Sequence, residues 1–220
     1  MSPGRCGRSA PVVSEILPVV LGYVLGSMPW GYWLPLVAKR VDIRRVGSGN
    51  IGAANVWRHL GLRWGLAVAA LDGAKGAAAA LVGSSVGGEL VGVLAGVAAL
   101  VGHWRPLFLG FARGGKVVAT TGGAALALAP LAALAASGVW IAVFLVGRYS
   151  SLASLAGAVA LPPLVFVFGA DWPVLAFAIG ASAAILVLHR GNIRRLLAGE
   201  ERRFGFSLRS ARTRALSSER

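Results

Sequence analysis

Cysteine, histidine and acidic residues are scarce in this 220-residue sequence, and each shortage excludes a class of protein. Cys6 is the single cysteine, so the chain has neither an internal disulfide nor a CxxC motif. His59, His103 and His189 stand far apart and no HExxH motif occurs, so we predict no metal site. Charged residues make up 14% of the chain, against about 25% in an average soluble domain. A water-soluble globule is therefore not expected.

Apolar and basic residues dominate instead. The hydrophobic fraction is 56% and the mean hydropathy is +0.72. Lysine and arginine number 22 against 8 acidic residues, which gives a formal charge of +14. Long apolar runs separate the basic clusters, so nucleic acid is a poor candidate partner. A bilayer with its anionic lipids or anionic substrates explains both features, and we predict an integral membrane protein.

Hydropathy predicts an all-α bundle of about seven transmembrane helices. The apolar stretches are 16–38, 64–86, 89–104, 114–129, 130–147, 151–169 and 172–188. The uncharged segment 117–147 fits either one long tilted helix or two short ones.

Basic residues favour two helices in that segment. With two helices there, 19 of the 22 basic residues lie on one side of the membrane, whereas one helix would place Arg148 on the opposite side. The positive-inside rule then predicts an amino terminus outside and a carboxyl terminus in the cytoplasm. We expect an N-terminal extension at 1–15, a single transmembrane domain at 16–198 and a basic cytoplasmic tail at 199–220.

The strongest candidate binding motif is the polar string GSGNIGAANVWR. Alternating glycines expose backbone N–H groups that can surround an anion, and asparagine, serine and arginine side chains add donors. A loop that only caps a helix would also contain glycine, but this density of donors favours phosphate binding. The candidate ligands are Gly47, Ser48, Gly49, Asn50, Asn55 and Arg58.

Three further clusters are predicted at the same membrane face. The string RGGKVVATT places Gly114, Gly115 and Lys116 at a helix start, where simple positive-inside anchoring is the alternative explanation. His189 and Asn192 are three residues apart and share a helix face, and Ser154 lies one turn inside a span.

Inside the second predicted span, Asp72 and Lys75 form a pair with either a functional or a packing role. A small transporter of an organic anion would also explain the hydropathy, the basic face and this pair. Transporters, however, usually bind near the bilayer midplane, whereas these motifs lie at one face. A lipid head-group phosphotransferase would need acidic metal ligands, which are too few here.

Three strings also occur in the order and spacing of a known family: GSGNIGAANVWRHLG, GHWRPLFLGFARGGKVVAT and HRGNIRRLLAGEE. Together with GSMPWGYWL, LDGAKG and RYSSLAS they resemble the bacterial membrane acyl-phosphate:glycerol-3-phosphate acyltransferases of the PlsY type, over roughly residues 16–203.

The resemblance implies a seven-span inner-membrane enzyme whose active site faces the cytoplasm. Such an enzyme transfers a fatty acyl group from acyl phosphate to the 1-hydroxyl of glycerol 3-phosphate, which gives lysophosphatidic acid and phosphate and begins phospholipid synthesis. It implies no cofactor and no metal. The expected partners are the two substrates and membrane lipids, with no obligate protein partner.

By motif position, the resemblance implies that Ser48 and Asn50 hold the donor phosphate, and that Arg58 and Lys116 bind phosphate groups including that of glycerol 3-phosphate. The implied catalytic residues are Lys116, Ser154, His189 and Asn192. The hydroxyl proton is expected to pass to the donor's own phosphate, with His189 as the alternative base.

The sequence departs from the family pattern at four positions. They are Ala54 for threonine, Arg113 for lysine, Val117 for glycine and Gly191 for glutamate. The first and third change the expected phosphate geometry, because one removes a hydroxyl donor and the other restricts the backbone.

Overall fold

The computed structural model describes residues 12–205, which form helices and connecting loops without a β-strand. The helices are α1 (Val12–Gly26), α2 (Trp30–Lys39), α3 (Ala53–Leu60), α4 (Leu62–Trp104), α5 (Val118–Leu128), α6 (Pro130–Gly147), α7 (Ser150–Val167), α8 (Trp172–Leu188) and α9 (Arg190–Leu197), with 3₁₀ helices η1 (Ile43–Arg45) and η2 (Leu107–Leu109). The all-helical prediction is confirmed for this part of the chain. Residues 1–11 of the predicted extension and 206–220 of the predicted tail lie outside the described residues.

The first apolar stretch is broken, so the prediction of one helix over 16–38 is wrong. Helix α1 ends at Gly26 and α2 begins at Trp30, after Pro29. Proline disfavours helical backbone in the residue before it and has no N–H to donate, so the helix stops at this point. The carbonyl of Met28 is thereby left free of the helical pattern and accepts a side-chain hydrogen bond described below.

Helix α4 is bent back on itself at Gly87 and Gly88, whose backbone angles are not helical. Gly88 has a φ of +76°, which glycine adopts readily because it has no β-carbon. The two arms pack closely: a β-carbon on Gly83 would lie 2.6 Å from the carbonyl oxygen of Val91. The arms correspond to the predicted stretches 64–86 and 89–104.

The uncharged segment 117–147 forms two helices, as the distribution of basic residues predicted. Helix α5 ends at Leu128, and Ala129 has non-helical angles of φ −145° and ψ 74°. Pro130 occupies the first turn of α6, where its missing N–H removes no helical hydrogen bond.

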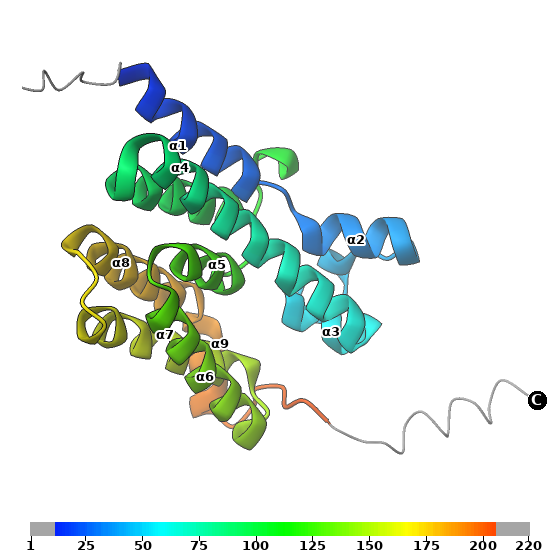
Figure 1. Cartoon of the computed structure of the whole chain (residues 1–220). Coiled ribbons are helices and arrows are strands. Elements are labelled where there is room, and N and C mark those ends of the chain that lie inside the picture. The colour runs from blue at the N-terminus through cyan, green and yellow to red at the C-terminus, as the bar shows by residue number, and fades with distance from the viewer. Residues whose placement is uncertain (1–11, 206–220) are drawn as a thin grey trace, which may run out of the picture.

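Helix α5 occupies the middle of the bundle, between α4 on one side and α6 and α8 on the other (Figure 1). The core around it is built mainly from small side chains, including Ala80, Ala124, Ala132 and Ala178. Small residues let helices approach closely, which is the main way that helices associate within a bilayer.

Large apolar side chains cover the outside of the bundle. Val146 is 83% exposed, and Phe166 and Trp172 are 71% and 72% exposed. Exposure on this scale is typical of surfaces that contact lipid. Within residues 12–205, three stretches are long and apolar enough to span a bilayer, namely Leu62–Leu109, Pro130–Gly147 and Ser150–Val167. A fourth results if α8 and α9, which meet at a bend of 58°, form one span.

Candidate active site

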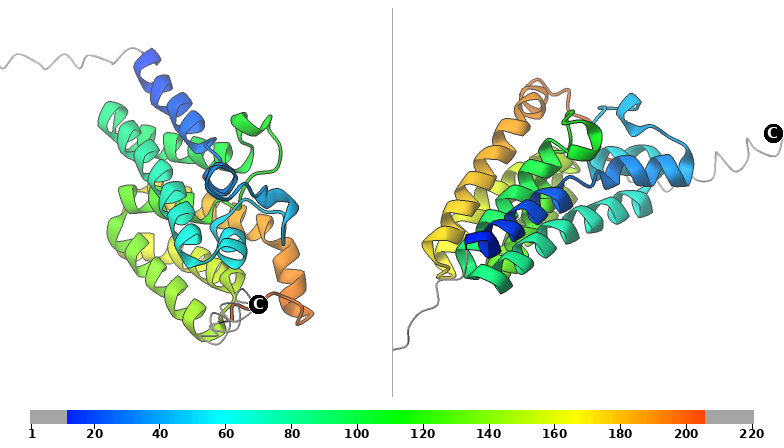
Figure 2. Two further views of the ribbon diagram at one scale, coloured as in Figure 1. Left: turned by 90° about the vertical axis from the view of Figure 1, so that its right-hand side faces the viewer. Right: turned by 90° about the horizontal axis from the view of Figure 1, so that it is seen from above.

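A cavity of about 870 Å³ opens at the end of the bundle where α3, α9 and the loops before α3 and α5 meet. Figure 2 shows this end from a second direction, with α9 (orange) on the far side of the bundle from the turn between α7 and α8 (yellow). The predicted site residues that line the cavity are Ser48, Gly49, Asn50, Asn55, Arg58, Gly114, Lys116, Ser154, His189 and Asn192. Gly47 and Gly115 were also predicted, but they do not line the cavity: Gly47 is exposed and Gly115 is buried against the His103 ring.

Asn55 shapes the first glycine loop from inside. Its side chain is buried, and its Nδ2 donates to the carbonyls of Ile43, Val46 and Asn50 at 3.3, 3.0 and 3.0 Å. Its Oδ1 accepts from the backbone N–H of Ser48 at 3.2 Å. Both polar atoms of Asn55 are thus occupied by the loop, so this residue holds the loop in shape.

The two glycine loops touch each other. In the first loop, Gly47 and Gly49 have φ values of +64° and +69°, so the turn requires residues without a β-carbon penalty. Asn50 accepts the N–H of Gly52 at 2.8 Å and turns its Nδ2 toward the carbonyl of Gly114, 3.4 Å away in the second loop. Motifs about 60 residues apart in the sequence are thereby brought to one wall of the cavity.

The second glycine loop is held against the end of α4. Gly114 and Gly115 donate their N–H groups to the carbonyls of Trp104 and His103 at 2.9 and 3.1 Å. These bonds replace helical ones, so α5 begins at Val118 and not at the predicted residue 114. Val117 has a φ of +57°, a conformation that costs a non-glycine residue about 1–2 kcal/mol. The valine at this position therefore occupies a backbone conformation suited to glycine.

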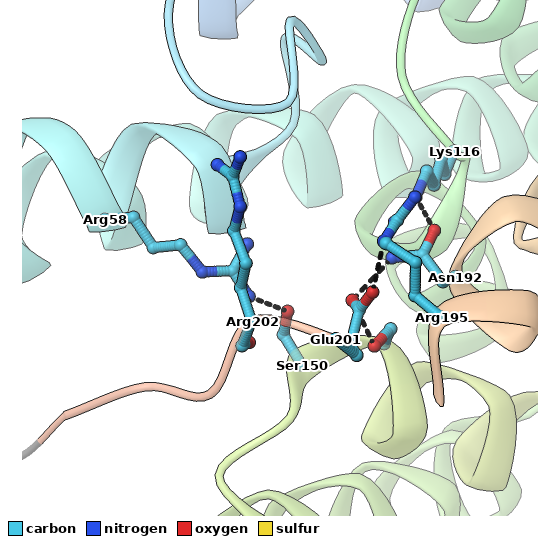
Figure 3. A network of polar contacts seen from close by, with 8 residues as sticks. Arg58, Lys116, Ser150, Asn192, Arg195, Glu201 and Arg202 are labelled. Carbon is cyan, nitrogen blue, oxygen red and sulfur yellow. Dashed lines mark hydrogen bonds and ion pairs between the residues drawn. The ribbon is translucent and has the colours of Figure 1, made fainter. Parts of the chain in front are cut away.

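Lys116 projects from this loop into a polar network drawn in Figure 3. Its Nζ donates to Oδ1 of Asn192, and Nδ2 of Asn192 donates to Oε1 of Glu201 at 2.7 Å. Within residues 12–205, Asn192 is the one side-chain acceptor that Nζ has. Two of the three ammonium N–H groups therefore remain for a ligand.

Glu201 is the centre of this network, and the sequence analysis did not select it. The carboxylate is buried, and it accepts from Ser151 Oγ and Asn192 Nδ2 through Oε1 and from Arg195 Nε through Oε2, each at 2.7 Å. Burial raises its pKa, but the three hydrogen bonds and the arginine charge hold the pKa below its ordinary value. A lone acidic pair, Glu200–Glu201, within an arginine-rich segment was the available signal.

The segment after α9 continues to pack against the bundle as far as Phe204. The N–H of Phe204 donates to the carbonyl of Arg148 at 2.8 Å, and its ring lies 4.6 Å from the Trp57 ring. The Arg58 guanidinium stacks on the Phe204 ring at 4.3 Å and donates to the carbonyl of Arg202 at 3.1 Å. This segment, predicted as part of a tail, supplies one wall of the site.

Arg58 and Lys116 are the two partly buried cations that face the cavity without a carboxylate partner in the described chain. Burial lowers the pKa of both, and that of Lys116 falls to about 8. The nearby charges of Arg195, Arg113 and Arg58 lower the pKa of Lys116 further, and Glu201 partly offsets them. Nε of Arg58 is buried and has no hydrogen-bond partner among the described residues. Both cations would gain from a bound anion.

Ser154 and His189 complete the polar wall. Ser154 Oγ donates to the carbonyl of Ser150 at 2.7 Å and accepts from Nε1 of Trp140 at 3.2 Å. His189 is buried, and its Nδ1 lies 2.8 Å from the carbonyl of Ile185. A carbonyl can only accept, so Nδ1 carries a proton and the Nε2 of the neutral ring is left as an acceptor.

The charges and the wall chemistry of the cavity indicate what it can hold. Seven cationic residues line it against two carboxylates, and both carboxylates are paired. Deeper in the bundle the wall is apolar, with Ala125, Ala133, Ala136, Ala158 and Leu161 from α5, α6 and α7. Fold and site therefore define a helical membrane protein whose cavity suits a molecule with an anionic head and an apolar chain.

Comparison with known proteins identifies the family. The profile described as glycerol-3-phosphate acyltransferase matches residues 16–199. The chain belongs to this family. A glycerol-3-phosphate acyltransferase from Desulforudis audaxviator is 46% identical over 194 residues, covering 88% of this chain and 98% of the relative. Glycerol-3-phosphate acyltransferase 2 from Moorella thermoacetica is 44% identical over 190 residues, covering 86% and 97%.

Solved structures agree with this assignment. A crystal structure of PlsY (YgiH), an integral membrane glycerol 3-phosphate acyltransferase in its glycerol 3-phosphate form, has a TM-score of 0.83 and 42% identity to this chain. It matches 87% of this chain and 96% of its own. The lysophosphatidic acid form of the same protein gives a TM-score of 0.79. None of these relatives supports the transporter alternative.

Proposed function

We propose that this protein transfers a fatty acyl group from acyl phosphate to the 1-hydroxyl of glycerol 3-phosphate, with lysophosphatidic acid and inorganic phosphate as products. The observation that carries the proposal is the placement of Arg58 and Lys116, without carboxylate partners, at the polar end of a cavity with an apolar inner wall. The forms in which the PlsY relative was crystallised support the acceptor and the product. This reaction is the first acylation step of phospholipid synthesis.

The two anions bind to two groups of residues. Ser48, Asn50 and the neighbouring backbone take the phosphate of the donor, and Lys116 and Arg58 take phosphate groups including that of glycerol 3-phosphate. Asn192 sets the direction of the Lys116 ammonium through the bond between its Oδ1 and Nζ. Holding two anions so that hydroxyl and carbonyl carbon meet supplies much of the rate enhancement, because acyl phosphate is already activated.

The transfer forms an ester bond between the carbonyl carbon and the hydroxyl oxygen, and it breaks the bond between that carbon and the phosphate oxygen. The hydroxyl proton passes to the departing phosphate, so no cofactor, metal or protein carrier is needed. His189 is the alternative base, since its Nε2 is left as an acceptor. If His189→Gln kept full turnover and the same pH profile, the histidine would have no part in the proton transfer.

In the bilayer, the proposed arrangement has seven passes, formed by α1, the two arms of α4, and α5 to α8. The connections that border the cavity carry basic residues, whereas the turns at Gly87–Gly88, Ala129–Pro130 and Gly169–Asp171 carry none. This asymmetry supports a cytoplasmic carboxyl terminus, an external amino terminus, and an active site that faces the cytoplasm of a bacterial inner membrane.

Phosphate release from purified protein tests the function. With acyl phosphate and glycerol 3-phosphate together we expect phosphate and lysophosphatidic acid in equal amounts, and with acyl phosphate alone we expect little release. Purified protein without any other chain is sufficient. Release that does not depend on glycerol 3-phosphate, or no release at all, would overturn the proposal. The matched control is Lys116→Met, in which glycerol 3-phosphate-dependent release should be lost.

A further inference from the structure

Asp72, Lys75 and His103 form a charged cluster between the two arms of α4, next to the cavity. Lys75 Nζ lies 2.8 Å from Asp72 Oδ1 and 2.8 Å from His103 Nδ1, and His103 Nδ1 lies 3.6 Å from Asp72 Oδ1. The three side chains are 3–5% exposed. The reaction proposed above uses none of them.

Lys75 decides where the proton of the His103 ring lies. Its third partner is the carbonyl of Met28 at 2.8 Å. The ammonium therefore donates to that carbonyl and to His103 Nδ1, and it forms an ion pair with Asp72. His103 Nδ1 is one of those acceptors and carries no proton, which places the ring proton on Nε2. The ion pair and the bond to Nδ1 hold the histidine ring in one orientation, while Asp72 Oδ1 has an ion-pair partner but no hydrogen bond within the described chain.

The cluster joins three places where helices are interrupted. Met28 lies in the break between α1 and α2, His103 lies in the last turn of α4, and the carbonyl of His103 holds the N–H of Gly115 in the loop before α5. The His103 ring also fills the position that a β-carbon of Gly115 would take, since such a carbon would overlap Nε2. The residue after Gly115 is Lys116.

We propose that Asp72, Lys75 and His103 act as a positioning unit for Lys116. The paired charges fix the His103 ring, the ring supports the backbone of Gly115, and that backbone sets where the Lys116 ammonium enters the cavity. The inference rests on the proposed function in one respect, namely that Lys116 binds a phosphate group. His103 acts through Gly115 and Lys116 and is a positioning residue.

A double-mutant cycle between His103 and Gly115 tests the proposal, with calorimetric binding of inorganic phosphate as a readout that requires no turnover. Gly115→Ala forces a methyl group into the ring and should weaken phosphate binding about tenfold. His103→Asn keeps an acceptor for Lys75 but removes the outer part of the ring. In that background Gly115→Ala should cost less than about threefold, because contacting residues are not additive. Equal costs in both backgrounds would overturn the proposal.

Two variants separate positioning from stability. His103→Phe keeps the ring but removes the acceptor for Lys75, so the thermal midpoint should fall while Gly115→Ala still costs about tenfold in phosphate affinity. Ser182→Ala removes a buried hydrogen bond between α8 and the carbonyl of Ala158 in α7 and is the matched control. It should lower the thermal midpoint without changing phosphate affinity. If it weakened phosphate binding as Gly115→Ala does, the readout would report stability alone and the positioning role would be rejected.

A wild-type protein that binds phosphate but shows no glycerol 3-phosphate-dependent release would overturn the proposed function and leave the coupling test intact. Active wild-type protein without the His103–Gly115 coupling would overturn only the positioning role.

Discussion

A comparison of Lys75 and Lys116 shows how the number of protein partners separates a structural charge from one that is available to a ligand. Lys75 donates to an imidazole and a carbonyl and forms an ion pair with a carboxylate, so three protein groups surround its ammonium. Lys116 has one side-chain acceptor within the described chain and lines a cavity with six arginines. Lys75 is buried and Lys116 is partly buried. The number of protein partners around each ammonium predicts loss of stability at the first and loss of affinity at the second.

Breaking the ion pair between Asp72 and Lys75 should have the largest effect. Asp72→Asn removes the carboxylate and leaves the Lys75 charge uncompensated in the interior, which typically costs about 3–5 kcal/mol. We expect a clear fall in the thermal midpoint of the purified protein in detergent. Asp171→Asn, at an exposed helix start, is the control and should leave the midpoint unchanged. A stable Asp72→Asn protein would show that the pair has little structural weight.

Substitution of Lys116 should have the opposite result, namely a loss of activity without a loss of stability. Lys116→Met removes a charged donor from the anion site and should lower kcat/KM for glycerol 3-phosphate by about 100- to 1,000-fold, as for one oxyanion donor. The thermal midpoint should not fall, since the variant leaves no carboxylate unpaired. Lys116→Arg should recover part of the activity. A drop in stability matching that of Asp72→Asn would erase the contrast between the two lysines.

Glu201 lies between these extremes, because it pairs with Arg195 and reaches Lys116 through Asn192. Glu201→Gln keeps the shape and removes the charge, so the hydrogen bonds from Ser151, Asn192 and Arg195 weaken. We expect a loss of about 2 kcal/mol in stability, the usual contribution of a bond to a charged group, together with reduced kcat/KM. Thermal unfolding and kinetics on one preparation measure both. A change in kinetics without a change in stability would show that Glu201 behaves like Lys116 and not like Lys75.

The smallest expected effect concerns pH. Burial lowers the pKa of Lys116 to about 8, so its ammonium is charged below that pH and binds anions, and it becomes neutral above it. In the wild type, kcat/KM for glycerol 3-phosphate should therefore fall above pH 8, approaching about tenfold per pH unit. Lys116→Arg should keep its charge and remove this decline. A decline that persists in Lys116→Arg must come from another group.

Much of the cavity lining could be predicted from the sequence because its polar residues lie in short, dense strings. The glycine loops carry Ser48, Asn50 and Lys116 within a few residues of glycines, and the basic residues predicted that these loops lie at the same end of the bundle. The break between α5 and α6 was predicted for the same reason. Local composition and charge distribution are sufficient when function and topology are both encoded within such strings.

Other features of the fold and the site could not be predicted, because they depend on contacts between residues that the motifs do not show. Glu201 is defined by Ser151, Asn192 and Arg195, and the arginines around it made the segment look like a solvated tail. Hydropathy did not predict the break after α1, because Pro29 interrupts the helix without making the apolar stretch more polar. Asn55 was predicted to bind phosphate, yet its amide is occupied by its own loop.

The position of Glu201 and Phe204 near the carboxyl end affects how this enzyme is made. Translation runs from the amino end, so every helix of the bundle leaves the ribosome before the carboxylate that orders Asn192 and the ring that supports Arg58. An interrupted product that stops before residue 201 would therefore insert its helices without these two contacts, and we expect it to be inactive.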